Sequence, residues 1–442
     1  MSKVNEHRKG YKHTPLGWIP EEWEVRKLCS IADIQQGISK GKEVDASHLV
    51  NVPYMRVANV KEGYLDLEEI KFIDVDSRNY QKYLLRKGDI LITEGGDPDK
   101  LGRGAIWNNE VTDCIYQNHL FRIRPLNGSL LAPYFYQFLQ GKRARTYFLN
   151  CAKQTTGIAS INSFQVNEMP LAIPSNSEQR RIIAILSTWD EAIAKTQQLI
   201  SLLRQRNKGL MQQLLTGRSR LNKFDKPWIQ INFGEVFKFI KSFPISRDGL
   251  VASGKDDSML YCIHYGDIHT LYRNQFLDFS TQLGIPRIKQ RDITIDDGEL
   301  LKEGDIIIAD ASEDYEGVGV AVEVLNLGNK KAVAGLHTLA VRDSKSITVP
   351  LFRAFLFSGE GIRNQLRKRA TGTSVYSVSK STMISLLISI PGIEEQQRIS
   401  EVLSRATEEL DIHEKRLFAL QQQKKGLMQK LLTGEIRVNP QN

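Results

Sequence analysis

Residues 208–217 read Lys-Gly-Leu-Met-Gln-Gln-Leu-Leu-Thr-Gly, and residues 425–434 read Lys-Gly-Leu-Met-Gln-Lys-Leu-Leu-Thr-Gly. The two segments agree at nine of ten positions and lie 217 residues apart. At the same offset, Ile-Pro-Ser-Asn-Ser-Glu-Gln-Arg-Arg-Ile at 173–182 is matched by Ile-Pro-Gly-Ile-Glu-Glu-Gln-Gln-Arg-Ile at 390–399. Similarity at a fixed offset marks an internal repeat. The chain therefore holds one unit twice, with a variable part before each constant segment.

Within each constant segment, apolar residues recur at alternating spacings of four and three. Kept over more than four heptads, this spacing is the a/d seam of a coiled coil. Two polar residues, Asn207 and Lys424, occupy equivalent seam positions, where they either face solvent or set the register of the helices. The predicted helix seam consists of Ile182, Leu186, Trp189, Ile193, Ile200, Leu203, Leu210 and Leu214 in the first copy and Ile399, Leu403, Leu410, Leu417, Leu420, Leu427 and Leu431 in the second.

Both helices carry start and stop signals. Ser175 and Glu178 have the spacing of a capping box, and Gly217 and Gly434 are C-cap candidates. A helix over residues 178–214 would be roughly 55 Å long at about 1.5 Å per residue. Antiparallel pairing within the chain is the simplest way to bury both apolar stripes. The tail after the second helix parallels the linker after the first, so we expect it to return to the N-terminal segment.

The variable parts contain short β-branched runs broken by glycine and aspartate. Asp89–Thr93, Phe121–Arg124, Asp305–Ala309 and Val318–Val322 predict strands, and helical patterns follow at Ala132–Phe148 and Pro350–Lys368. The predicted fold class is α+β, with two β-rich domains joined by two long helices that pair as an antiparallel coiled coil in a pseudo-twofold internal repeat. The expected boundaries are 1–174 for the first domain, 175–217 for the first helix, 218–391 for the second domain, 392–434 for the second helix and 435–442 for the tail.

Charge and residue chemistry permit a nucleic-acid partner. Lysine and arginine outnumber the acids by 60 to 51, and the isoelectric point is near 9.2. Arginine forks pair with guanine, asparagine and glutamine amides pair with adenine, and lysine or hydroxyl groups suit phosphates. Taken singly, each such residue is also explained as a solvated surface charge or a loop hydrogen bond. The candidate DNA-binding residues are Arg56, Asn59, Lys61, Arg103, Asn118, His119, Lys153, Gln154, Thr155 and Thr156 in the first domain and His264, Tyr265, Asp267, Arg287, Lys289, Arg291, His337, Thr371, Thr373, Ser374, Tyr376 and Lys380 in the second.

Motifs for catalysis are missing from the sequence. The chain has no Pro-Pro pair for an adenine methyltransferase tetrad, and Gly37–Lys42 is one residue short of a P-loop. His264 and His269 lack partners at metal-ligand spacing, and the four cysteines are far apart. We therefore expect no catalytic residue, metal or cofactor in this chain. A polar N-terminus and short apolar runs predict a cytoplasmic protein without a membrane span.

Taken together, these motifs resemble the specificity (S) subunit of type I restriction-modification enzymes. The resemblance covers essentially the whole length. It rests on the twin Ile-Pro-x-x-x-Glu-Gln-x-x-Ile helix starts, the twin Leu-Leu-Thr-Gly helix ends, Gly17-Trp18-Ile19-Pro20 before Trp23, the two Gly-Asp-Ile strands and the Thr-Gly segments before each helix.

The resemblance implies two target recognition domains, each reading one half of a bipartite, asymmetric double-stranded DNA sequence. It implies that the helices dock two modification (methyltransferase) subunits, which use S-adenosylmethionine, and that restriction subunits add ATP- and Mg²⁺-dependent translocation and cleavage. A self-sufficient DNA methyltransferase or nuclease is the alternative from the enzyme class, and the missing motifs oppose it. A coiled-coil scaffold without DNA is the third alternative, and the divergence of two polar, basic domains opposes that.

Overall fold

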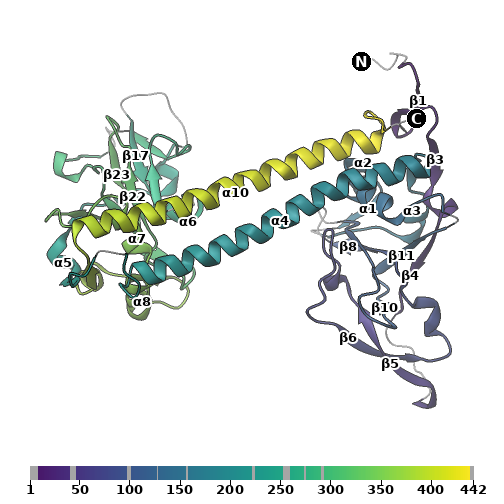
Figure 1. Cartoon of the computed structure of the whole chain (residues 1–442), viewed down its shortest axis with the longest axis horizontal. Helices are drawn as coiled ribbons and strands as arrows, with labels where there is room; N and C mark the ends of the chain where they lie inside the picture. The colour runs from purple at the N-terminus through teal and green to yellow at the C-terminus, as the bar shows by residue number, and fades with distance from the viewer. Residues whose placement is uncertain are drawn as a thin grey trace. The chain divides into compact units, whose positions relative to one another are not determined.

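The structure is a computed structural model, and its contacts divide the chain into two compact units (Figure 1). It describes residues 8–39, 46–96, 101–126, 128–155, 158–221, 224–251, 259–272, 275–289 and 293–438. Unit 1 comprises residues 1–197 and 415–442, and unit 2 comprises residues 198–414. Each unit thus combines one variable domain with one half of each long helix, whereas the linear division expected from the sequence kept the helices separate.

Unit 1 is built on a four-stranded sheet of order β4-β11-β7-β9, with a three-stranded sheet β10-β5-β6 beside it. Its domain contains β1 (Tyr11–Thr14), β2 (Gly17–Pro20), β3 (Glu24–Lys27), β4 (Ala32–Gln36), β5 (Leu49–Met55), β6 (Lys71–Asp76), β7 (Ile90–Thr93), β8 (Gly95–Gly96), β9 (Gly104–Ile106), β10 (Ile115–Tyr116), β11 (Leu120–Pro125), α1 (Ala132–Gln140), α2 (Lys142–Cys151), β12 (Lys153–Thr155), β13 (Ile158–Ser160), α3 (Ser163–Asn167) and β14 (Pro170–Ile173).

Unit 2 repeats this plan, with a five-stranded sheet β16-β24-β20-β22-β18 and a three-stranded sheet β19-β17-β23. In both units the three-stranded sheet holds one parallel pair, β5 with β10 and β17 with β23. Its elements are β15 (Ile229–Asn232), α5 (Phe233–Val236), β16 (Phe237–Ile240), β17 (Met259–Ile263), α6 (Tyr265–Thr270), β18 (Phe276–Asp278), β19 (Arg287–Lys289), β20 (Ile306–Ala309), β21 (Ala311–Ser312), β22 (Ala321–Leu325), β23 (Ala332–Ala334), β24 (Thr338–Asp343), α7 (Phe352–Ser358), α8 (Glu360–Arg369), β25 (Tyr376–Ser377), α9 (Lys380–Ile384) and β26 (Leu387–Ile390).

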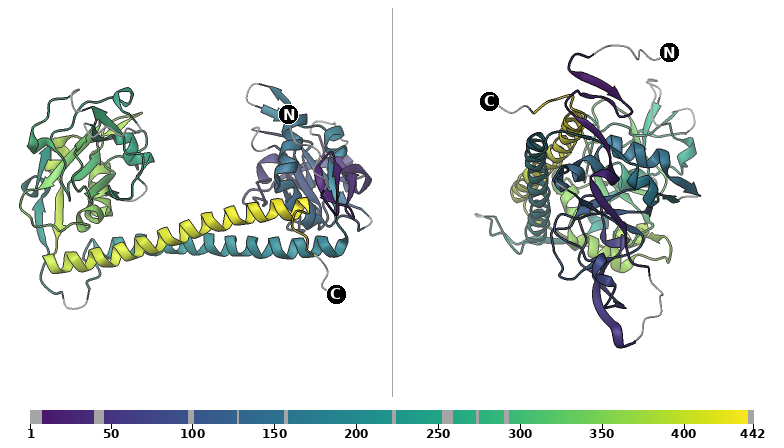
Figure 2. Two further views of the ribbon diagram at one scale, coloured as in Figure 1. Left: turned by 90° about the horizontal axis from the view of Figure 1, so that it is seen from above. Right: turned by 90° about the vertical axis from the view of Figure 1, so that its right-hand side faces the viewer.

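The two long helices are α4 (Asn176–Leu214) and α10 (Ile393–Thr433), which lie side by side and antiparallel (Figures 1 and 2). Within unit 1, Lys424 Nζ bonds Asp190 Oδ1 at 2.5 Å. Within unit 2, Asn207 Nδ2 donates to the carbonyl of Ala406 at 2.7 Å. Both polar seam residues therefore make cross-helix contacts, which supports the register-setting alternative.

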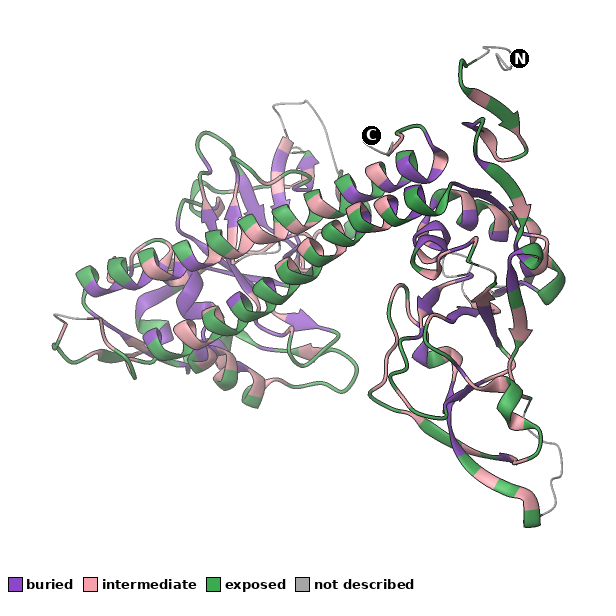
Figure 3. Cartoon of the chain, turned by 45° about the vertical axis from the view of Figure 1, so that its right-hand side comes forward, coloured by how far each residue is buried: buried purple, intermediate pink, exposed green. Residues whose placement is uncertain are grey.

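All predicted seam residues are buried or half-buried, while the outer faces of the helices are exposed (Figure 3). The antiparallel coiled coil is confirmed.

The Glu-Gln pair at the start of each long helix attaches that helix to its own domain. The carboxylate of Glu178 accepts a hydrogen bond from Trp23 Nε1 at 2.9 Å, and that of Glu395 accepts one from Trp228 Nε1 at 3.2 Å. Because this carboxylate is used for tertiary contacts, the expected capping box is only half formed, with Glu178 N donating to Ser175 Oγ at 3.3 Å.

The adjoining glutamines hold the loop that leads into the first helix pair of each domain. Gln179 Oε1 accepts from the Leu131 N–H at 2.9 Å, and Gln396 Oε1 accepts from the Val349 N–H at 3.0 Å. Both amide groups are buried, and each Nε2 also donates to two backbone carbonyls. The repeated motif is therefore explained by buried polar groups that are satisfied in the same way twice.

The tail returns to the N-terminal segment, as the sequence predicted. Arg437 Nε donates to Glu178 at 2.9 Å, and Tyr11 Oη donates to the carbonyl of Gly434 at 2.8 Å. At the equivalent place in unit 2, Arg220 Nε donates to Glu395 at 2.6 Å. The tail and the linker thus make the same contact, each with its own unit.

Three predicted segments differ from the structure. The helix expected over Ala132–Phe148 is divided at Gly141, and the one expected over Pro350–Lys368 is divided at Gly359, because both glycines have extended backbone angles. The strand expected at Val318–Val322 begins at Ala321, since residues 315–319 form a turn with Gly319 at φ +74°. Within the described residues, no helix combines the length and apolarity needed to cross a bilayer.

Candidate nucleic-acid interface

In unit 1, the candidate interface is organised where β7 ends and β11 begins. Glu94 follows β7, and its N–H donates to the carbonyl of His119, the residue before β11, at 3.0 Å. The carbonyl of Glu94 accepts from the Ile161 N–H at 2.8 Å, directly after β13. This brings the β12–β13 hairpin, which carries Lys153, beside the histidine. Residues distant in sequence therefore meet at one strand end.

Unit 2 has the same set of backbone hydrogen bonds at the equivalent strand end, and we call this set the frame of each unit. The Asp310 N–H donates to the carbonyl of His337 at 3.1 Å, and the Asp310 carbonyl accepts from the Val378 N–H at 2.9 Å. The segment before Val378 is the second Thr-Gly loop, where Gly372 has φ +126°. A Cβ at Gly372 would clash with the Val375 carbonyl oxygen, so only glycine fits this turn.

Each frame holds an imidazole against a carboxylate. His119 Nδ1 lies 2.6 Å from Glu94 Oε2, and His337 Nδ1 lies 3.3 Å from Asp310 Oδ1. Burial raises the pKa of Asp310, and His337 opposes that shift. The sequence singled out both histidines but neither carboxylate, although Glu94 and Asp310 each stand five residues after the aspartate of a Gly-Asp-Ile strand.

A polar hollow of about 560 Å³ opens beside the pair in unit 2. Asp310, His337 and Lys380 line it together with Lys241. Lys380 Nζ lies 5.5 Å from the centre of the Phe239 ring, within cation–π distance, and both side chains line the hollow. Cations and a histidine around an open hollow suit an anionic ligand such as a phosphate.

The paired candidates Arg56/Asn59 and His264/Asp267 occupy equivalent helical turns, after β5 and β17. Arg56 is half-buried, and its Nη2 pairs with Glu69 at 2.8 Å. Asn59 is buried and donates to the carbonyls of two loop residues, at 2.8 Å and 3.0 Å. Asn59 therefore stabilises a loop, and we remove it from the candidate contacts.

Asp267 also has a structural position. It is 1% exposed, and Arg247 Nη1 donates to it at 2.6 Å. His264 is buried, its Nδ1 accepts from the Gly266 N–H at 3.2 Å, and burial lowers its pKa. Tyr265 packs against both His264 and His337, at ring distances of 4.7 Å and 5.2 Å. Asp267 is thus removed from the contacts, while Tyr265 supports the exposed histidine.

The other candidates are scattered or surface-exposed. Lys61 pairs with Asp66 at 3.4 Å. Arg103 is half-buried, and its carbonyl accepts from the Thr93 N–H at 2.9 Å, next to Glu94. Arg287 contacts Tyr261, with 2.6 Å between its Nη2 and the hydroxyl, and lies with Lys289 on β19. Exposed residues of the second loop are Thr371, Thr373 and Ser374, with Tyr376 half-buried at its end and Asn118 half-buried before His119. The side chains of Gln154 and Thr155, and the whole of Thr156 and Arg291, lie outside the described residues.

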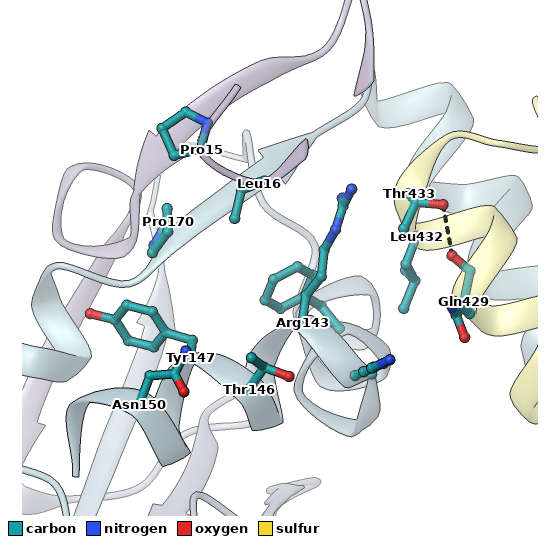
Figure 4. A pocket seen from close by; sticks show the side chains of 13 residues that line it. Pro15, Leu16, Arg143, Thr146, Tyr147, Asn150, Pro170, Gln429, Leu432 and Thr433 are labelled. Atoms are coloured by element: carbon teal, nitrogen blue, oxygen red, sulfur yellow. Dashed lines mark hydrogen bonds between the residues drawn. The ribbon is translucent and has the colours of Figure 1, made fainter. Parts of the chain in front are cut away.

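Another hollow of unit 1 lies apart from the candidate DNA contacts. It measures about 630 Å³ and lies between α2, the β1–β2 turn and the end of α10 (Figure 4). Leu16, Tyr147 and Leu432 contribute apolar walls, and Arg143 stands among them with its pKa lowered by burial. None of the candidate DNA contacts lines it. Among the described residues, no cluster of three or more His, Cys, Asp or Glu side chains forms a metal site.

Comparison with known proteins gives one consistent result. A family model described as "Type I restriction modification DNA specificity domain" matches residues 20–205 and 268–422. The putative type I restriction enzyme MjaX specificity subunit of Methanocaldococcus jannaschii is 24% identical over 448 residues, which cover 97% of each chain. The EcoKI specificity subunit of Escherichia coli K12 is 26% identical over 156 residues, 35% of this chain and 32% of that one.

Two solved structures share the fold. The S subunit of a type I restriction-modification system from M. genitalium superposes with a TM-score of 0.52 at 14% identity, covering 98% of this chain and 99% of that one. A chain from a study of complex assembly and conformational transition of the type I R-M system superposes with a TM-score of 0.60 at 14% identity, covering 95% and 99%.

Proposed function

Because the chain belongs to the type I restriction-modification DNA specificity family, whose specificity subunits are non-catalytic, we propose that it selects a bipartite, asymmetric double-stranded DNA target, with one half-site read by each unit. The paired helices dock two modification subunits. S-adenosylmethionine binds to those modification subunits, and ATP and Mg²⁺ serve the restriction subunits.

One observation carries this proposal: the frame is repeated while the reading residues differ. Arg56 and His264 stand at equivalent turns, as do Asn118 and Leu336 before the two histidines. Base edges are read by side-chain donors and acceptors, so different side chains on one frame read different sequences. Two different half-sites make the target asymmetric.

The test is to express the chain together with type I modification subunits from the same organism and to map methylated bases in the host DNA. The expected result is one interrupted sequence whose halves differ. Exchange of residues 218–391 for the same region of a relative should change one half only. Methylation of unrelated positions, or a change in both halves, would overturn the assignment of one half-site to each unit.

A further inference from the structure

Among the described residues, a histidine–carboxylate pair is a polar feature that both candidate interfaces share. His119 with Glu94 and His337 with Asp310 occupy the same place on the same backbone hydrogen bonds. The residues around them differ: Gln117-Asn118 precedes one histidine and Gly335-Leu336 precedes the other. A residue that reads bases should differ between domains that read different half-sites. A pair that is repeated in both units, on a surface whose other residues differ, suits a contact that carries no sequence information.

The geometry leaves one edge of each imidazole for a partner. Each Nδ1 faces its carboxylate, and the side chains of His119 and His337 are 59% and 50% exposed. The carboxylates are more covered, at 24% and 25%. In the part of the chain that the structure describes, neither Nε2 atom has a hydrogen bond. The outward Nε2 is therefore available.

The backbone of His337 supports a functional role for the side chain. Its φ is +54°, in the left-handed region, which residues other than glycine adopt only at a cost in free energy. Glycine or asparagine would adopt this conformation more readily. A histidine held there, beside Lys380 and the hollow of unit 2, is consistent with selection for its imidazole.

We propose that His119 and His337 are twin contacts to the DNA sugar–phosphate backbone, one in each unit, which position the reading residues without reading bases. This rests on the proposed function. With Nδ1–H donated to the carboxylate, Nε2–H donates to a phosphate oxygen in the protonated imidazole. Glu94 and Asp310 are positioning residues that orient the ring.

The experiment measures DNA affinity of the complex with its modification subunits at several salt concentrations. The duplexes are the mapped target, the target with either half scrambled, and an unrelated sequence. The variants are His119→Gln, His337→Gln, the double variant, and His119→Lys with His337→Lys. His13→Gln is the matched control, because His13 is exposed on β1, away from the frame. Thermal unfolding of each variant reports any loss of structure.

Each glutamine variant should lose about three- to tenfold in affinity for every duplex, and the salt slope should fall by about one contact. The losses should add in the double variant, since the frames lie in separate units. Lysine should restore the salt slope, because it keeps a cation for the phosphate. The control should behave as wild type.

A loss that follows only one half-site would overturn the proposal, because it would make the histidine a base reader. Unchanged affinity, with or without a lower unfolding temperature, would reduce the pair to a surface contact within the protein and would also overturn it. If the wild-type complex fails to distinguish its mapped target from unrelated DNA, the proposed function itself fails, which is a separate result.

Discussion

Glu323 on β22 is fully buried and caps the start of α7. Its Oε2 accepts from the N–H groups of Leu351 and Ala354, at 2.9 Å and 3.1 Å. Burial raises the pKa of Glu323 to about 7, with Arg353 opposing the shift. The folded chain therefore holds this proton up to a pH at which the unfolded chain has lost it, so stability from this group falls as the pH rises from about 4.5 to 7.

Replacing Glu323→Gln removes the charge and keeps an acceptor for the two N–H groups. The variant should be more stable than wild type at pH 8, by about 1–3 kcal/mol, because wild type must then bury an ionised carboxylate. The difference should disappear at pH 5, where wild type is protonated. Chemical denaturation at both pH values measures this, and a variant less stable at both would contradict it.

Arg56 is the residue for which we expect base reading. Its guanidinium is held by Glu69, whose side chain is 69% exposed, so DNA can replace the carboxylate as partner. Arg56→Ala should cost ~1–3 kcal/mol if the fork reads a guanine, and only for duplexes with an intact first half-site.

Arg56→Lys keeps the positive charge but lacks the paired N–H donors of the guanidinium group, so it should recover little of that affinity. Affinity of the complex for duplexes with one half scrambled distinguishes a base contact of Arg56 from a phosphate contact. A uniform loss would identify a phosphate contact, and no loss would place Arg56 outside the interface.

At the scale of the element, the junction of helix and domain is held by a few buried polar groups. Glu178→Ala would leave Trp23 Nε1 and the Arg437 guanidinium without their shared acceptor. Loss of one partner from such a buried network costs about 2–4 kcal/mol. We expect faster hydrogen exchange in β3 and in the tail, with the equivalent part of unit 2 unchanged.

Glu22→Ala is the matched control, because Glu22 also pairs with Arg437, at 3.0 Å, but is 70% exposed. An exposed pair of this kind contributes at most about 1 kcal/mol. Equal effects of the two substitutions would show that the burial of Glu178 does not determine the stability of the junction.

Periodic elements were predictable from the sequence, and contacts between distant residues were not. The seam followed from a spacing that only a paired helix explains. The helix breaks at Gly141 and Gly359 could not be predicted, because the flanking residues favour helix and a single glycine is tolerated inside a helix. Asn59 and Asp267 have the chemistry of DNA contacts, but their burial comes from loops and an arginine elsewhere in the chain. Glu94 and Asp310 gained a role only when the sheet placed each beside a histidine.

At the scale of the whole molecule, both long helices pass from unit 1 into unit 2 and are paired in each. Duplication of residues 191–197 in α4 together with 408–414 in α10 adds one heptad to each and preserves the seam. The added length is about 10 Å, near three base-pair steps of about 3.4 Å. We expect the methylated sequence to keep both halves and to gain a longer spacer.

The duplication in α4 alone is the control, since it shifts one half of the seam out of register and should reduce folding. Methylation mapping of the double duplication is the measurement. Retained activity with the original spacer would show that the helices do not determine the distance between half-sites.

The twin glutamate–tryptophan–arginine junction has a consequence for how such a chain evolves. The groups that join domain to helix, such as Glu178 and Glu395, are not among the side chains proposed to face DNA. A mutation that changes the sequence read therefore need not weaken the fold, and the two properties can be selected separately. Because the two junctions are alike, recombination between genes at these points would join a new domain to a helix that already has the residues to bind it.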